Sequence, residues 1–99
     1  MTGCRHVALF VFREDATDEQ IAAVSDGLAA LPAQVPEITA YRIGPDLGLN
    51  DGNHDYAVVA DFESVDGYLA YRDHPAHRAL LADTIRPILA SRAAVQYDI

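Results

Sequence analysis

Cysteine is almost missing from this chain of 99 residues, in which Cys4 stands alone. A single cysteine excludes an internal disulfide and a zinc site built from several thiolates. We interpret Cys4 as a free thiol in a reducing cytoplasm, with an intersubunit bridge as the alternative. No apolar run is long enough to span a bilayer, and Arg5, His6 and Arg13 interrupt any stretch that resembles a signal peptide.

Basic residues are scarce as well. Seven Lys and Arg residues stand against 15 Asp and Glu residues, which gives a formal net charge of −8 at pH 7. This excess of negative charge disfavours nucleic acids and anionic membranes as partners. The chain also lacks a glycine-rich phosphate loop and the GxSxG, HExxH and CxxC motifs. The best-marked nucleotide, hydrolase and metal sites are therefore absent from the sequence.

Hydrophobic residues make up 51% of the chain, which is enough to build the core of one domain over residues 1–99. Residues 4–12 and 55–63 are predicted to be strands, and the first of them is apolar on both faces. Residues 38–44 and 93–99 are predicted to form two further strands, so the sequence indicates four strands in total.

Helices are predicted between these strands. A capping box begins at Thr17 and starts a helix that is expected to stop near Pro32. Ser64 can cap a short helix, and Pro75 suits the first turn of another. Pro87 lies inside that last helix and should bend or divide it.

The resulting order, β-α-β-β-α-α-β, predicts an α+β protomer of the ferredoxin-like split βαβ type. Its four-stranded antiparallel sheet should carry all the helices on one face. Val7, Leu9, Val11 and Val59 then fall on the bare face. Because open apolar patches usually mark interfaces, we expect a twofold homodimer that joins these sheet faces.

Two histidines in the stretch YRDHPAHR, residues 71–78, raise the question of a functional site. A helix that begins at Pro75 leaves His74 outside as a cap or a solvent-facing residue and turns His77 toward the core. His6 lies on the strand face that should meet the helices, so His6 and His77 should border one cavity. Tyr71 lies on the flank of the short helix that precedes them.

Each of these side chains also has a purely structural interpretation. A histidine on an apolar stripe is usually a hydrogen-bonded core residue, and a tyrosine often packs with one wet end. A metal site formed by His74 and His77 with Asp51, His54 or Asp55 is disfavoured, because a histidine pair three residues apart is a weak signal. We therefore predict no metal.

Three blocks of sequence together resemble the stress-responsive dimeric α/β-barrel family, known as the Dabb domain. They are His6–Phe12, Asp61–Ser64 and His74–His77, and they occur in the family's order and spacing. The resemblance implies a ferredoxin-like protomer that dimerises through its sheets into a dimeric α/β barrel. Most members of the family have no assigned activity.

One branch of the family, the plant olivetolic acid cyclases, closes a linear polyketide by an intramolecular aldol reaction without metal or organic cofactor. Resemblance to this branch implies catalytic roles for His77, Tyr71 and His6. The acidic residue that orients the catalytic histidine in the cyclases corresponds here to Gln96, with Asp98 as the alternative. Other side chains are expected to line the pocket, namely Ala8, Phe10, Val24, Leu28, Val58 and Leu81.

Three hypotheses of function remain open at this point. The first is a cofactor-free enzyme of the polyketide-cyclase type that acts on a small apolar carbonyl compound, with His77 as general base and Tyr71 as hydrogen-bond donor. Small residues such as Val24 and Ser25 replace the aromatics of the cyclases, which implies a different or smaller ligand. The second hypothesis is a non-catalytic, small-ligand-binding or stress-associated dimer. A third, a monooxygenase, rests on a shared fold alone.

Overall fold

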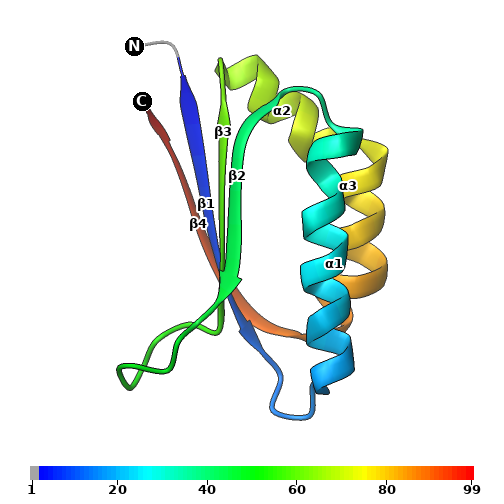
Figure 1. Ribbon diagram of the computed structural model, residues 1–99, viewed down its shortest axis with the longest axis vertical. Helices are drawn as coiled ribbons and strands as arrows, with labels where there is room; N and C mark the ends of the chain where they lie inside the picture. The colour runs from blue at the N-terminus through cyan, green and yellow to red at the C-terminus, as the bar shows by residue number, and fades with distance from the viewer. Residues whose placement is uncertain (1–2) are drawn as a thin grey trace.

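The computed structural model describes residues 3–99, so the first two residues of the predicted domain lie outside it. A sheet packs against a helical layer (Figure 1), and the strands follow the order β2-β3-β1-β4. All strand pairs are antiparallel, which confirms the predicted ferredoxin-like α+β arrangement. The elements are β1 (Cys4–Phe12), α1 (Asp18–Gln34), β2 (Ile38–Pro45), β3 (Tyr56–Phe62), α2 (Val65–Asp73), α3 (Pro75–Leu80) and β4 (Leu89–Asp98).

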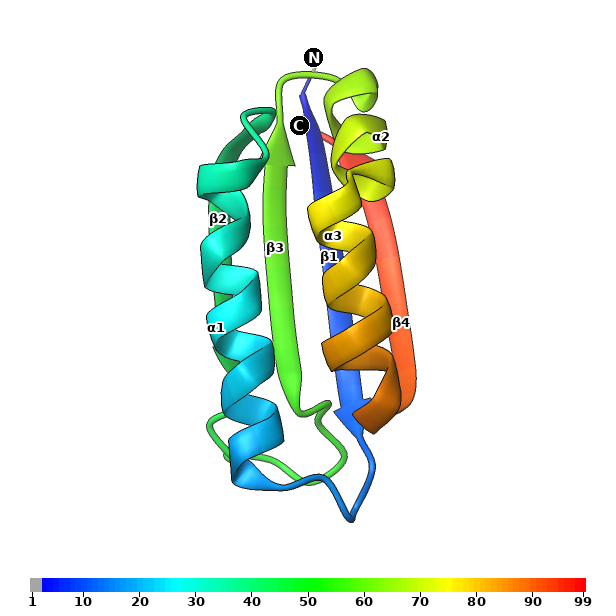
Figure 2. The ribbon, with the colours of Figure 1, turned by 90° about the vertical axis from the view of Figure 1, so that its right-hand side faces the viewer.

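Strand β1, one of the two inner strands, places its even-numbered residues against the helices. His6, Ala8 and Phe10 are buried there, and their odd-numbered neighbours are only half-buried. Strand β3 follows the same alternation, since Val58 and Ala60 are buried opposite Ala8 and His6. Figure 2 shows that α1, α2 and α3 all cover this one face of the sheet. The core therefore lies between the two layers.

Helix α1 begins as predicted but ends later. The Thr17 side chain accepts a hydrogen bond from the Gln20 backbone N–H at 3.1 Å, and the Gln20 side chain accepts one from the Thr17 N–H at 2.9 Å. The predicted stop near Pro32 is wrong, because the helix continues to Gln34. Burial of Leu31 and Val35 holds this last turn in place, and the Val35 N–H donates to the Leu31 carbonyl. That packing offsets the one backbone donor that proline lacks.

The segment after α3 is irregular, as expected near Pro87. A π-helical turn spans Leu81–Ile85 and a 3₁₀ turn spans Arg86–Ile88 before β4 begins. The predicted start of the last strand at residue 93 is wrong, since pairing with β1 begins at Leu89. Strand β4 lies at the sheet edge and is largely exposed on both faces, so no apolar alternation marked its first residues. No helix within residues 3–99 is long and apolar enough to cross a membrane.

The face of the sheet opposite the helices carries the predicted apolar patch. Val7 pairs with Val59 on one side and with Val95 on the other, so three valines form a row across the strands. Val95 retains 54% of its accessible surface. Leu9 and Val11 extend this patch along β1 and are half-buried. We call these five residues the outer face.

Candidate functional site

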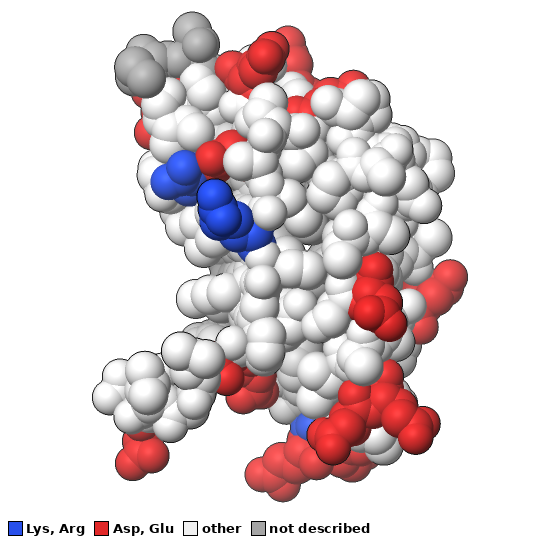
Figure 3. All heavy atoms as spheres, in the orientation of Figure 1, with Lys and Arg blue, Asp and Glu red and all other residues white. Residues whose placement is uncertain are grey.

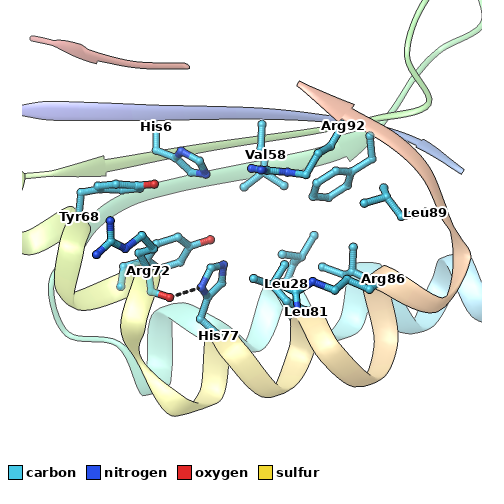
Figure 4. A pocket seen from close by; sticks show the side chains of 14 residues that line it. His6, Leu28, Val58, Tyr68, Arg72, His77, Leu81, Arg86, Leu89 and Arg92 are labelled. Atoms are coloured by element: carbon cyan, nitrogen blue, oxygen red, sulfur yellow. Dashed lines mark hydrogen bonds between the residues drawn. The ribbon is translucent and has the colours of Figure 1, made fainter. Parts of the chain in front are cut away.

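A cavity of about 210 Å³ lies between the sheet and the helical layer (Figure 4). His6 lines it from β1, and Tyr71 and His77 line it from the helical side. Most of the expected pocket residues also form its wall, namely Ala8, Phe10, Leu28, Val58 and Leu81. Val24 needs correction, because its short side chain is fully enclosed in the core and does not reach the cavity.

The helical break at His74–Pro75 fixes the orientation of His77. In a continuous helix, the Ala76 N–H would bond the Arg72 carbonyl four residues earlier. Here the Ala76 N–H donates to the His74 ring Nδ1 at 3.1 Å, which makes His74 a cap. The Arg72 carbonyl is thereby left for His77, whose Nδ1 lies 3.0 Å from it.

This hydrogen bond determines which nitrogen of His77 can act as a base. A carbonyl oxygen can only accept, so Nδ1 of His77 carries the proton and Nε2 keeps its lone pair. Burial lowers the pKa of His77. The hydrogen bond to the Arg72 carbonyl raises this pKa and the positive charge of Arg92 lowers it, and the net result is a lowered pKa. His77 therefore remains neutral near pH 7, with Nε2 as a proton acceptor.

His6 faces His77 from the sheet. The free ring nitrogen of His77 is a hydrogen-bond acceptor, whereas that of His6 is a donor. The Gln96 side-chain N–H donates to His6 Nδ1 at 2.8 Å, so the proton of the neutral ring lies on Nε2. Burial, followed by the charges of Arg92 and His77, lowers the pKa of His6 to about 4. A neutral His6 therefore provides an N–H donor to the site.

The expected support for His77 is corrected by this geometry. Gln96 pairs with His6 across the β1–β4 ladder, whereas His77 lies in the opposite layer and is held by a backbone carbonyl. Asp98 pairs with Cys4 and is exposed, two positions farther along β4. Neither residue orients His77.

Tyr71 is buried in contact with His77, with their ring centroids 4.2 Å apart. Its hydroxyl lies 3.1 Å from the hydroxyl of Tyr41 on β2, a partner that sequence reasoning missed. Burial raises the pKa of both phenols, so both keep their protons. When Tyr41 donates to Tyr71, the Tyr71 O–H remains free to donate in turn.

Other lining residues were also missed. The Tyr68 ring lies 5.1 Å from the His6 ring, and Arg72, Arg86 and Arg92 contribute three guanidinium groups. Arg92 escaped notice because the last strand was predicted to begin one residue after it. Arg86 follows the buried Ile85 in the irregular segment, where no helical stripe can be extrapolated.

The site thus combines a proton acceptor on His77 with hydrogen-bond donors on His6 and Tyr71, enclosed by apolar walls. Such a set can remove a proton and stabilise the oxyanion that results. Within residues 3–99 no three His, Cys, Asp or Glu side chains gather in a metal-binding cluster. The predicted absence of a metal stays a prediction.

The chain resembles known proteins in its sequence and in its fold. The family model described as "Stress responsive A/B Barrel Domain" (Dabb) matches residues 4–99. A stress-response A/B barrel domain-containing protein of Arabidopsis thaliana is 29% identical to the chain, and the match covers 77% of this chain and 68% of that protein.

Solved structures of other proteins have the same fold as this chain. A dimeric ferredoxin-like protein of unknown function from Thermobifida fusca YX is 50% identical, with a TM-score of 0.91, and the match covers 98% of this chain and 91% of that one. The hydroxynitrile lyase from Passiflora edulis is 20% identical with a TM-score of 0.86, covering 99% of this chain and 94% of that one. At that identity the likeness concerns the fold alone.

Proposed function

The chain belongs to the stress responsive A/B barrel domain (Dabb) family, and from this premise we propose that it is a homodimeric, cofactor-independent acid–base enzyme. Its substrate would be a small, partly apolar carbonyl compound. The observation that carries this proposal is the bond between His77 Nδ1 and the Arg72 carbonyl, because it leaves Nε2 of His77 unprotonated beside the cavity.

The proposed reaction begins with proton abstraction from a carbon atom next to a carbonyl. His77 Nε2 takes the proton, and the electron pair of the C–H bond moves onto the carbonyl oxygen to form an enolate. The N–H of His6 and the O–H of Tyr71 stabilise that oxygen. In an aldol closure the enolate carbon attacks a second carbonyl, and protonated His77 returns its proton to the new alkoxide.

The volume of the cavity limits the substrate. About 210 Å³ lies below the range of about 300–1,000 Å³ that is common for drug-sized ligands. A compact metabolite fits this space better than a long-chain polyketide. Ring closure of the polyketide-cyclase type is thus one form of the proposal, with a short substrate.

Sheet-to-sheet dimerisation is the second part of the proposal. The outer face is apolar and uncovered, and the loop between β2 and β3 projects on that side of the sheet (Figure 1). Leu47 and Leu49 in this loop are 83% and 77% exposed. A second copy would cover both features, and the structure from T. fusca is itself described as dimeric. A cytoplasmic location is likewise proposed, on the basis of the single free Cys4.

A non-catalytic, ligand-binding dimer is the competing hypothesis. It is favoured by the hydroxyl of Tyr71, which is already engaged by Tyr41 and is deeply buried. In that case, the cavity would bind a ligand without changing it.

Hydrogen exchange distinguishes the two hypotheses without knowledge of the natural substrate. A panel of small ketones, β-diketones and keto acids is incubated with the protein in deuterium oxide, and deuterium uptake beside the carbonyl is followed by proton NMR. We expect the wild-type protein to accelerate uptake for at least one compound. His77→Gln should lower that rate by about 10²–10⁴-fold, the usual contribution of a general base.

The matched control is His54→Gln, the same substitution in the loop between β2 and β3, outside the cavity. It should retain the wild-type rate. Binding of a panel compound without any exchange would favour the non-catalytic dimer.

A further inference from the structure

The cavity wall is rich in arginine although the chain is acidic. The chain has 15 acidic residues against 7 basic ones, yet none of the fourteen lining side chains is acidic, and three of them are arginines. On the face shown in Figure 3, acidic side chains crowd the lower end and basic ones are sparse. The wall of the cavity therefore differs in charge from the acidic chain as a whole.

The three arginines differ in their partners. Arg72 forms a two-pronged ion pair with Asp73, with nitrogen–oxygen distances of 2.9 and 3.1 Å. None of the ion pairs found among residues 3–99 involves Arg86 or Arg92. Two positive charges of the wall are thus available to a ligand.

Arg92 is the better placed of these two. It pairs with Phe10 across the β1–β4 ladder, which puts it on the cavity side of β4. In Figure 4 its guanidinium extends over the cavity toward His6. Its charge acts on both His6 and His77, as the lowered pKa values of both rings reflect in part.

An ionic ligand would complete this arrangement. A guanidinium group presents a planar fork of donors that matches the two oxygens of a carboxylate. Arg92 lies on the exposed edge strand and the histidines lie deeper, so a carboxylate at Arg92 would leave the rest of a short molecule beside His6 and His77.

We propose that the substrate of this site carries a free carboxylate, which Arg92 binds bidentately while Arg86 adds a second positive charge. The substrate class is then a short keto acid, with its carboxylate at the entrance and its reacting carbonyl between His6 and His77. The carboxylate assignment stands on Arg92 and Arg86, whereas the position of the carbonyl rests on the function proposed above.

Binding of benzoate and of its neutral analogue benzamide, measured by isothermal titration calorimetry, tests the carboxylate assignment. Wild-type protein should bind benzoate about 10- to 100-fold more tightly than benzamide, as expected for a charge-assisted pair. Arg92→Gln should abolish this preference by weakening the binding of benzoate about 10- to 100-fold more than that of benzamide. Arg92→Lys should retain part of it, because lysine keeps the charge but loses the fork.

Two further variants complete the design. Arg13→Gln removes an exposed arginine outside the cavity and should bind like the wild type. His77→Gln should still prefer benzoate even though it lacks the proposed base, so a failure of the enzymatic proposal is distinguishable from a failure of this one. Equal affinity of wild-type protein for the two probes, or an unchanged preference in folded Arg92→Gln, would overturn the carboxylate assignment.

Discussion

At the scale of single residues, the two histidines of the cavity differ through their partners. A carbonyl holds one nitrogen of His77, and an amide N–H holds one nitrogen of His6. The same side chain thereby becomes an acceptor on one wall and a donor on the other. The sequence could place both rings at one cavity, because strand alternation and the helix start at Pro75 fix their faces. It could not reveal the partners, which depend on the register of β4 and on a freed backbone carbonyl.

The depressed pKa of His6 predicts a specific pH dependence of stability. The pKa falls from 6.5 to about 4 in the folded protein, so the unfolded chain binds more protons between these values. Stability should therefore decrease as the pH falls from about 6.5 toward 4, by up to about 3 kcal/mol, at about 1.4 kcal/mol per pKa unit.

Urea unfolding of wild type and His6→Gln at a series of pH values measures this contribution. The difference between the two free energies of unfolding should change over that pH range, because the variant lacks the titrating ring. A constant difference from pH 7 to pH 4 would show that His6 is not held neutral by the fold.

At the scale of elements, the break between α2 and α3 links a helix cap to the proposed base. The His74 ring accepts from the Ala76 N–H and so leaves the Arg72 carbonyl to His77. The cap was foreseeable, since Pro75 marks a helix start. The effect of the cap on His77 could not be foreseen from the sequence. It depends on whether the Ala76 N–H donates to the His74 ring or to the Arg72 carbonyl.

Replacement of this cap tests the link. His74→Ala should cost about 1 kcal/mol of stability, the usual loss for a removed N-cap, and should lower the exchange rate on the carbonyl panel. His74→Asn supplies another cap and should recover most of both properties. Stability comes from urea unfolding and exchange from NMR. Recovery of stability in His74→Asn without recovery of the exchange rate would contradict the link.

Strand β4 shows where sequence reasoning was insufficient. The alternation of β1 and β3 was visible because one face of each is buried, and both strands were predicted within one residue at each end. Residues 89–92 show no such alternation, since an edge strand that is open on both faces places little constraint on its side chains. Arg92 belonged to this unrecognised segment, and the positively charged side of the site was missed with it.

At the scale of the whole molecule, the sheet separates two surfaces. The helical side encloses the cavity, and the outer face presents its valine row and Leu9 to solvent or to a partner. An apolar patch of this kind favours association. The placement of both surfaces follows from the alternation of β1, which is why the sequence predicted them together.

Disruption of the outer face should therefore separate the subunits. Leu9→Glu or Val11→Glu places a carboxylate in the proposed interface and should convert a dimer into monomers in multi-angle light scattering at micromolar concentration. Val65→Glu introduces the same charge at a valine that is 60% exposed at the start of α2, in the helical layer, and should remain dimeric. A monomeric wild-type protein would contradict the sheet-to-sheet dimer.

The central claim is that His77 accepts a proton from the carbon atom next to a carbonyl, and deuterium uptake by the carbonyl panel tests it most directly. We predict that wild-type protein accelerates uptake near pH 7 and that the rate falls only at acidic pH, since burial lowers the pKa of His77 and keeps Nε2 unprotonated. His77→Gln should lose the acceleration at every pH. An equal rate in wild type and His77→Gln would contradict the claim.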